Sequence, residues 1–292
     1  MDWQKKVAIS GHNAPIYASV AHDQFIYSSA SDRFVTRWNV TTGIQDSFAI
    51  QLDASAYCLG WIEQLSLLII ACTNGTIIAV DPTTKKLIWE HNFLGKAIFS
   101  CVDCPSENLL VLGDTEGNLL LVDYNGQLVS TFLLNCGKIR QLKRFDKQLF
   151  VGSQDGTWRI LELPTFNETQ RVDAHEGGVT ALCYLATDQT LLTGGKDAQL
   201  RLWDCITGQQ LLSFPAHYQT IYGIEQINEQ LITVSMDKTI KIWNPTTWKV
   251  QQRIEFKQGG HNRSVNGCVV LNNDCFATFS DDRSLIIWQE NS

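Results

Sequence analysis

The sequence lacks the features that mark membrane, secreted and nucleic-acid-binding proteins. Its longest apolar stretches, such as residues 65–71 and 109–112, fall well short of the roughly 18 residues needed to span a bilayer. The first residues lead into no apolar segment, so we expect no signal peptide. No run of lysine or arginine occurs, and a net charge of −7 opposes general nucleic-acid binding. We therefore expect neither nucleic acid nor membrane among its partners.

Signatures of cofactor binding are equally scarce. Cys101 and Cys104 form the single Cys-x-x-Cys, whereas a structural zinc site takes four ligands, usually from two such pairs. No glycine-rich phosphate loop precedes a predicted helix. The nine cysteines are scattered and odd in number, which is typical of free thiols in a reduced cytoplasmic protein. We expect no metal, no cofactor and a cytoplasmic location.

What the sequence does contain is a repeat. At 292 residues it is long for one ordinary domain, but β-propellers exceed that size because they grow by adding sheets around an axis. Hydrophobic residues make up 44% of the chain and charged residues 18%, so it can bury a large core. Seven equivalent anchor positions are separated by 42, 42, 39, 42, 40 and 45 residues: Asp32, Asn74, Glu116, Asp155, Asp197, Asp237 and Asp282. The repeat fills residues 1–292, which predicts one domain.

Each repeat is predicted to be four short antiparallel strands. The fifth repeat shows this most clearly, with strands expected at 179–185, 190–194, 199–203 and 209–214. Apolar residues alternate within these segments, and turn residues separate them. No segment has a sustained 3.6-residue period, so helix should be almost absent.

Four of the seven repeats carry a set of polar residues at fixed spacing. In these repeats a hydroxyl stands four residues before the anchor Asp, a His stands 20–22 residues before it, and a Trp follows six residues after it. The sets are His12, Ser28, Asp32 and Trp38; His175, Thr193, Asp197 and Trp203; His217, Thr233, Asp237 and Trp243; and His261, Thr278, Asp282 and Trp288. Because the members occur together or not at all, we expect buried hydrogen-bond networks.

These sets resemble catalytic triads in composition, but the pattern favours a structural role. A nucleophile must be exposed to substrate beside its activating base. Four identical copies, each closed by an indole N–H donor, are instead typical of links between the strands of a sheet. We therefore expect no catalytic residue and no enzyme activity.

The period and the polar set resemble those of the WD-repeat family. The Trp-Asp dipeptide itself occurs as Trp203-Asp204, and Trp38-Asn39 and Trp243-Asn244 are near variants. The resemblance covers essentially the whole chain and implies an all-β, seven-bladed β-propeller of four-stranded antiparallel blades. It also implies a non-catalytic scaffold for protein–protein interaction. An alternative is a propeller enzyme, because residues 74–89 and 114–123 are similar to pyrroloquinoline-quinone-type repeats.

The order of the strands predicts how the last blade is completed. The third strand of the seventh repeat ends at Trp288, and residues 289–292 are too few for a fourth. Residues 3–9 have the pattern of a strand without a blade of its own. Pairing the two would complete the seventh sheet and remove two open edges.

The innermost strands supply the candidate binding residues. The second residue of each first strand can be aligned across the repeats: Tyr17, Tyr57, Phe99, Arg140, Thr180, Tyr222 and Asn266. The WD-repeat resemblance implies that these positions surround the mouth of a central channel, and that Lys196, Met236 and Asp281 lie on the same face. Aromatic residues and arginine are typical interface anchors. We expect a monomer that binds a peptide or loop of another protein here; the alternative is that these side chains only fill the channel.

Overall fold

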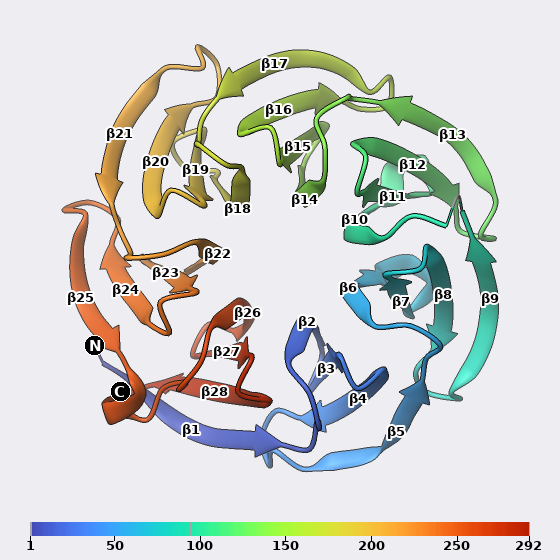
Figure 1. Cartoon of the computed structure of the whole chain (residues 1–292), viewed down its shortest axis with the longest axis horizontal. Coiled ribbons are helices and arrows are strands. Elements are labelled where there is room, and N and C mark those ends of the chain that lie inside the picture. The colour runs from blue at the N-terminus through green and yellow to red at the C-terminus, as the bar shows by residue number, and fades with distance from the viewer. Residues whose placement is uncertain (1, 94, 292) are drawn as a thin grey trace. The chain divides into compact units, whose positions relative to one another are not determined.

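The computed structural model describes residues 2–93 and 95–291, and their regular secondary structure is almost entirely β-strand. In this part of the chain, 28 strands hold well over half of the residues, and turns and loops hold most of the rest. The strands form seven four-stranded antiparallel sheets, which we call blades 1 to 7 (Figure 1). The only helices among these residues are three single 3-10 turns, Glu63–Leu65, Pro105–Glu107 and Phe256–Gln258. None of these helices is long enough to cross a membrane. The prediction of a seven-bladed β-propeller with almost no helix is confirmed.

The chain divides into two compact units, each described here by itself. Unit 1 comprises residues 1–55 and 215–292 and holds blades 1, 6 and 7. Unit 2 comprises residues 56–214 and holds blades 2 to 5. The extent of a single domain over residues 1–292 stays a prediction, and Met1 and Ser292 lie outside the described residues.

Within a blade the strands follow one another from the innermost to the outermost. In unit 1, blade 1 is β2 (Ile16–His22), β3 (Phe25–Ala30), β4 (Phe34–Asn39) and β5 (Gln45–Gln51), and blade 6 is β22 (Ile221–Ile227), β23 (Gln230–Ser235), β24 (Ile240–Asn244) and β25 (Lys249–Ile254). Blade 7 is β26 (Val265–Asn272), β27 (Cys275–Ser280), β28 (Ser284–Glu290) and β1 (Trp3–Ser10).

Unit 2 repeats this order four times. Blade 2 is β6 (Ala56–Ile62), β7 (Leu67–Cys72), β8 (Thr76–Asp81) and β9 (Lys86–Asn92), and blade 3 is β10 (Ile98–Cys104), β11 (Leu109–Asp114), β12 (Asn118–Asp123) and β13 (Leu128–Leu133). Blade 4 is β14 (Ile139–Phe145), β15 (Gln148–Ser153), β16 (Thr157–Glu162) and β17 (Asn167–Asp173), and blade 5 is β18 (Val179–Leu185), β19 (Thr190–Gly195), β20 (Gln199–Asp204) and β21 (Gln210–Pro215).

The core lies between the faces of neighbouring blades. In unit 2, Ile69 and Ile77 of blade 2 belong to the same buried cluster as Leu110 and Leu120 of blade 3. Strand β7 is buried along its whole length, since neighbours cover it on both faces, and this explains its continuous apolar sequence. The outermost strands are more exposed and more polar, as β9 and β17 show.

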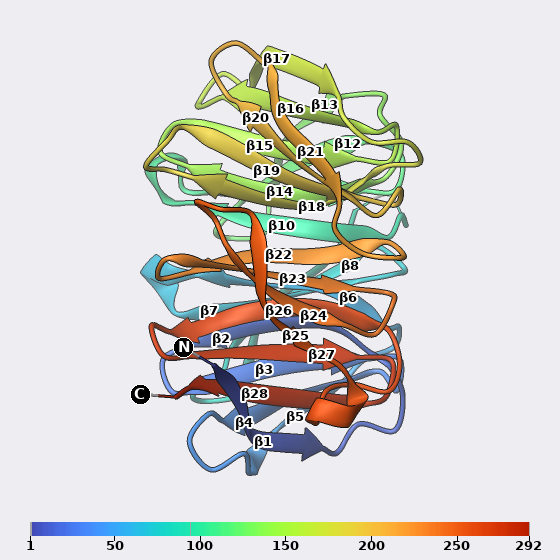
Figure 2. The same ribbon diagram turned by 90° about the vertical axis from the view of Figure 1, so that its left-hand side faces the viewer.

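The N-terminal strand completes blade 7, as the sequence predicts. Strand β1 pairs antiparallel with β28, with Trp3 opposite Glu290 and Ser10 opposite Ser284. Figure 2 shows the two strands side by side, near the labelled ends of the chain. The Trp3 side chain is buried, packs edge-on against Phe276 and donates from its indole N–H to Gln230 Oε1 at 2.8 Å.

Removal of residues 1–9 is expected to leave a markedly destabilised and aggregation-prone protein, because β28 becomes an open edge. Trp3→Ala alone should lower the free energy of unfolding by about 3–5 kcal/mol, since it empties a buried site. Thermal unfolding and light scattering measure the two effects. Gln4→Ala, which changes an exposed side chain of the same strand, is the control. Unchanged melting and solubility of the truncated protein would contradict this account of blade 7.

Candidate functional site

The four repeated polar sets are buried networks that link the strands of their blades. In blade 5, His175 Nδ1 lies 2.8 Å from Asp197 Oδ1, and His175 Nε2 lies 2.7 Å from Thr193 Oγ1. The Trp203 indole N–H donates to the same Thr193 hydroxyl at 2.8 Å. The arrangement fits a neutral imidazole that donates to the carboxylate and accepts from the hydroxyl.

The other three networks have the same geometry. The His–Asp, His–hydroxyl and Trp–hydroxyl distances are 3.0, 2.9 and 2.8 Å for His12, Asp32, Ser28 and Trp38; 3.1, 2.7 and 2.8 Å for His217, Asp237, Thr233 and Trp243; and 3.0, 2.9 and 2.9 Å for His261, Asp282, Thr278 and Trp288. All four hydroxyl residues have no exposed surface. A substrate could not reach these oxygens, so the geometry supports a structural role.

In the networks of blades 5 and 6 the pKa of the histidine and the pKa of the aspartate are both lowered. Burial raises the pKa of Asp197, but the hydrogen bonds from His175 and Arg201 outweigh it and bring that pKa down to about 2. Burial lowers the pKa of His175 and of His217 below the usual histidine value, although the neighbouring carboxylates oppose this. In blades 5 and 6 the folded protein therefore holds charged carboxylates beside neutral imidazoles.

Blades 3 and 4 contain different networks, which the sequence pattern missed. Asp114 is fully buried and accepts from the backbone N–H and the side-chain amide of Asn118, at 2.8 and 2.6 Å. In blade 4 the buried Arg159 donates to Asp155 at 2.8 Å and lies 3.2 Å from Glu168. An aspartate at the end of an otherwise apolar strand was the available signal for the first of these.

The seven aligned residues predicted for the channel mouth are bulged residues of the innermost strands. In each of these strands the pairing register shifts at the second residue: Tyr17, Tyr57, Phe99, Arg140, Thr180, Tyr222 and Asn266. A bulge interrupts the strand ladder and re-aims the side chain. The local backbone thus places seven aligned positions in the same special geometry.

We call the residues predicted for the channel mouth the rim residues. In unit 1 several of them contact one another. The Asn266 amide donates to Ile16 O at 2.9 Å and to Asp281 Oδ1 at 2.7 Å. The Tyr222 hydroxyl lies 3.9 Å from the sulfur of Met236, whose side chain is exposed. Both donors of the Asn266 amide are therefore used within the protein.

In unit 2 the rim combines aromatic rings with cations. The rings of Tyr57 and Phe99 have centroids 5.4 Å apart, and Lys138 Nζ lies 4.0 Å from the Phe99 centroid. Burial lowers the pKa of Lys138, and the charges of Arg140 and Lys196 lower it further. We call these five residues the rim patch: Tyr57, Phe99, Lys138, Arg140 and Lys196. Thr180, in contrast, is buried and hydrogen-bonded to Gly194 O.

Sequence reasoning missed Lys138, although a signal was present. The equivalent position, directly before each innermost strand, holds Pro15, Ser55, Ala97, Gly178, Thr220 and Ser264 in the other blades. Lys138 is thus the only charged residue at this position in the seven repeats.

Comparison with known proteins agrees with the repeat geometry. Residues 166–204 and 208–244 match the family model described as WD domain, G-beta repeat. The two matched segments include β20 and β24, whose Trp203 and Trp243 close the networks of blades 5 and 6. Two of the seven repeats of the chain thus match WD repeats.

Relatives of this WD-repeat protein differ widely in length. A WD repeat-containing protein of Schizosaccharomyces pombe is 25% identical over 80% of the chain and 68% of its own length. The apoptotic protease-activating factor 1 of Rattus norvegicus is 24% identical over 96% of the chain, which spans only 22% of that protein. The sterol regulatory element-binding protein cleavage-activating protein of Xenopus laevis is 31% identical over 37% of the chain and 8% of its own length.

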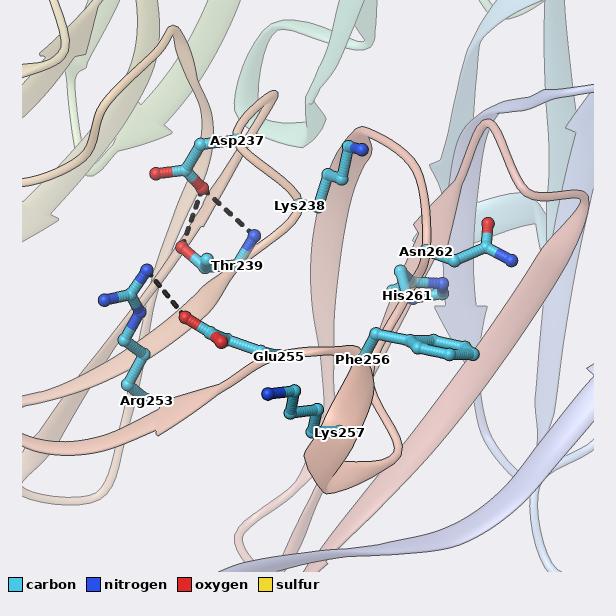
Figure 3. A pocket seen from close by; sticks show the side chains of 9 residues that line it. All are labelled: Asp237, Lys238, Thr239, Arg253, Glu255, Phe256, Lys257, His261 and Asn262. Carbon is cyan, nitrogen blue, oxygen red and sulfur yellow. Dashed lines mark hydrogen bonds and ion pairs between the residues drawn. The ribbon is translucent and has the colours of Figure 1, made fainter.

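A separate hollow of about 400 Å³ lies in unit 1 of the WD-repeat propeller (Figure 3). The loops around blades 6 and 7 line it, and the exposed Phe256 projects beside the loop that carries His261 and Asn262. Arg253 and Glu255 point toward each other there, and Arg253 Nη2 lies 2.6 Å from Glu255 Oε1. Within residues 2–93 and 95–291, no group of three or more His, Cys, Asp or Glu side chains is placed to hold a metal ion.

Asp197→Ala and Asp237→Ala are each expected to lower the free energy of unfolding by about 1–3 kcal/mol, because each leaves a buried His without its acceptor. Asn74→Ala is the matched control, since Asn74 Oδ1 accepts a bond from the backbone N–H of Thr76, outside any His network. Urea unfolding monitored by tryptophan fluorescence measures the difference. Equal losses at the three sites would contradict the structural role of the networks.

Stability is also expected to fall as the pH is lowered. The folded pKa of His175 and of His217 lies below that of the unfolded chain, so stability is lost as pH falls below about 6.5. The folded pKa of Asp197, about 2, lies below its ordinary value, so a second loss follows as pH falls from about 4 toward 2. Urea midpoints measured across this range should therefore decrease with acidification, and a midpoint that rises between pH 7 and 5 would refute the assignment of buried neutral imidazoles.

Proposed function

We propose that this WD-repeat propeller is a non-catalytic scaffold that binds a peptide or a loop of another protein at the rim of its innermost strands. The observation that carries the proposal is the rim patch of unit 2. Tyr57 and Phe99 lie on bulges of neighbouring blades with their rings in contact range, and both side chains are only half-buried. Partly exposed aromatic pairs of this kind are typical anchors of protein interfaces.

The rest of the fold supports a rigid platform. Buried clusters hold neighbouring blades of each unit together, and four networks with buried His, hydroxyl and Trp side chains link their strands. A rigid surface loses little conformational freedom on binding, so more of the contact energy remains as affinity. The rim can therefore present anchors without rearranging.

The rim of unit 1 contributes less to this proposal. Asn266 and Asp281 bond to each other, which favours a filling role for these two side chains. Tyr17, Tyr222 and Met236 remain candidate contact residues from the sequence, and we assign them a secondary part. The main contacts are assigned to Tyr57, Phe99, Arg140 and Lys196.

The cysteines bear on the cellular location of the scaffold. All nine cysteines are free thiols, and seven of them are buried. Free thiols persist in a reducing compartment, which supports a cytoplasmic location. We propose that the scaffold is itself a monomer and uses no cofactor.

Replacing both aromatic rings, Tyr57→Ala with Phe99→Ala, is expected to weaken the recovery of bound proteins from native lysate at least tenfold, about 1.4 kcal/mol of binding free energy. The melting temperature should change by no more than a few degrees, because the rings lie on the rim rather than between the blades. Quantitative mass spectrometry of the captured proteins and differential scanning fluorimetry measure the two effects.

Leu128→Ala with Val129→Ala is the matched control, since it removes two exposed apolar side chains from the outermost strand of blade 3. It should change neither recovery nor melting. A Tyr57/Phe99 variant that keeps every partner but unfolds early would show that the rings are core, and the proposed site would be wrong.

A further inference from the structure

Three cations gather on one part of an acidic protein. The chain has 30 acidic and 23 basic side chains, yet Lys138, Arg140 and Lys196 lie close enough for the two other charges to disfavour protonation of Lys138. Burial and the charges of Arg140 and Lys196 lower the pKa of Lys138, and no carboxylate raises it. Like charges held together in this way are unfavourable in the unbound protein and become favourable beside an anion.

The fold holds these cations in place. Lys138 directly precedes β14, and its carbonyl accepts the backbone N–H of Gln154 at 2.9 Å. Lys196 follows β19 of the next blade, and its N–H donates to Gly178 O at 3.2 Å. The same backbone bond thus fixes a lysine at the rim of two successive blades.

The aromatic pair sets where the Lys138 charge lies. Its ammonium group is 4.0 Å from the centroid of the Phe99 ring, an attractive cation–π contact, and that ring also contacts Tyr57. An apolar surface and a positive charge therefore adjoin each other within the rim patch. A ligand that matches both must combine negative charge with an apolar side chain.

Three other cations of unit 2 are already paired. Lys96 contacts Glu116, Arg159 bonds to Asp155, and Arg201 bonds to Asp197. Within residues 2–93 and 95–291, neither Lys138 nor Lys196 forms an ion pair. These two lysines thus retain their capacity to bind carboxylates of a partner.

We propose that the rim patch recognises an acidic peptide segment of a partner protein, in which aspartate or glutamate side chains flank an apolar residue. The apolar residue packs on Tyr57 and Phe99, while the flanking carboxylates contact Lys138, Arg140 and Lys196. This inference rests on the proposed function, because it names the kind of partner for the same surface. Charge complementarity here gives specificity for acidic partners and speeds their association.

The test uses the whole protein and a pair of fluorescein-labelled peptides. The acidic probe has a phenylalanine between two pairs of glutamates, and the matched probe has glutamine at every glutamate. Fluorescence anisotropy should show the acidic probe binding about tenfold or more tightly. Its affinity should fall as salt is added, because exposed charges are screened, while that of the glutamine probe should not.

Lys138→Gln and Lys196→Gln should each weaken binding of the acidic probe several-fold and leave binding of the glutamine probe unchanged. Lys147→Gln is the matched control, because Lys147 is an exposed lysine in the turn between β14 and β15. It should leave both affinities unchanged.

Two outcomes would overturn the acidic preference while leaving the proposed function intact. One is equal affinity for the two probes. The other is no binding of either probe by a protein whose partner recovery still depends on Tyr57 and Phe99. A single-stranded oligodeoxynucleotide that binds more tightly than the acidic peptide, and loses affinity in the Lys138 variant, would instead assign the patch to nucleic acid. Loss of the proposed function itself is recognised separately, by partner recovery that does not depend on the two aromatic residues.

Discussion

Burial of both faces of each sheet is the constraint on which the rest of the structure depends. The second and third strands of blades 2 and 3 are apolar on both sides, and such a blade alone would leave two large apolar faces in water. Neighbouring blades cover these faces, so stability comes from contacts between repeats more than from within one repeat. This constraint also explains why strand β1, which opens the sequence, pairs with β28 to complete the last blade.

A tightly packed apolar stack cannot accept polar side chains without partners, and the four networks meet that requirement. The imidazole, carboxylate and hydroxyl of each set satisfy one another, and the tryptophan supplies both a donor and apolar area. Where the histidine is missing, the protein uses either an apolar residue, as at Ile70, or a different network, as at Asp114 and Arg159. In these cases a buried polar group has a partner close by.

The rim follows from the same architecture in a different way. Every blade has its own innermost strand, and each of these strands has a bulge at its second residue. The bulge frees that side chain from the ladder, so its identity is not dictated by sheet pairing. Tyr57, Phe99 and Arg140 of unit 2 therefore occupy positions whose residue type sheet pairing does not dictate.

The sequence by itself determined the fold, because repeat spacing, strand alternation and correlated polar sets are all local patterns. It also determined that Tyr57, Phe99 and Arg140 hold equivalent positions, since they align across the repeats. Only the tertiary structure decided which rim residues act together. Asn266 is bonded to Asp281, whereas Lys138 stands over Phe99 although 39 residues separate them in the chain. The physical reason is that charge and stacking depend on distances across neighbouring blades, and those distances are set by how the blades pack rather than by spacing along the sequence.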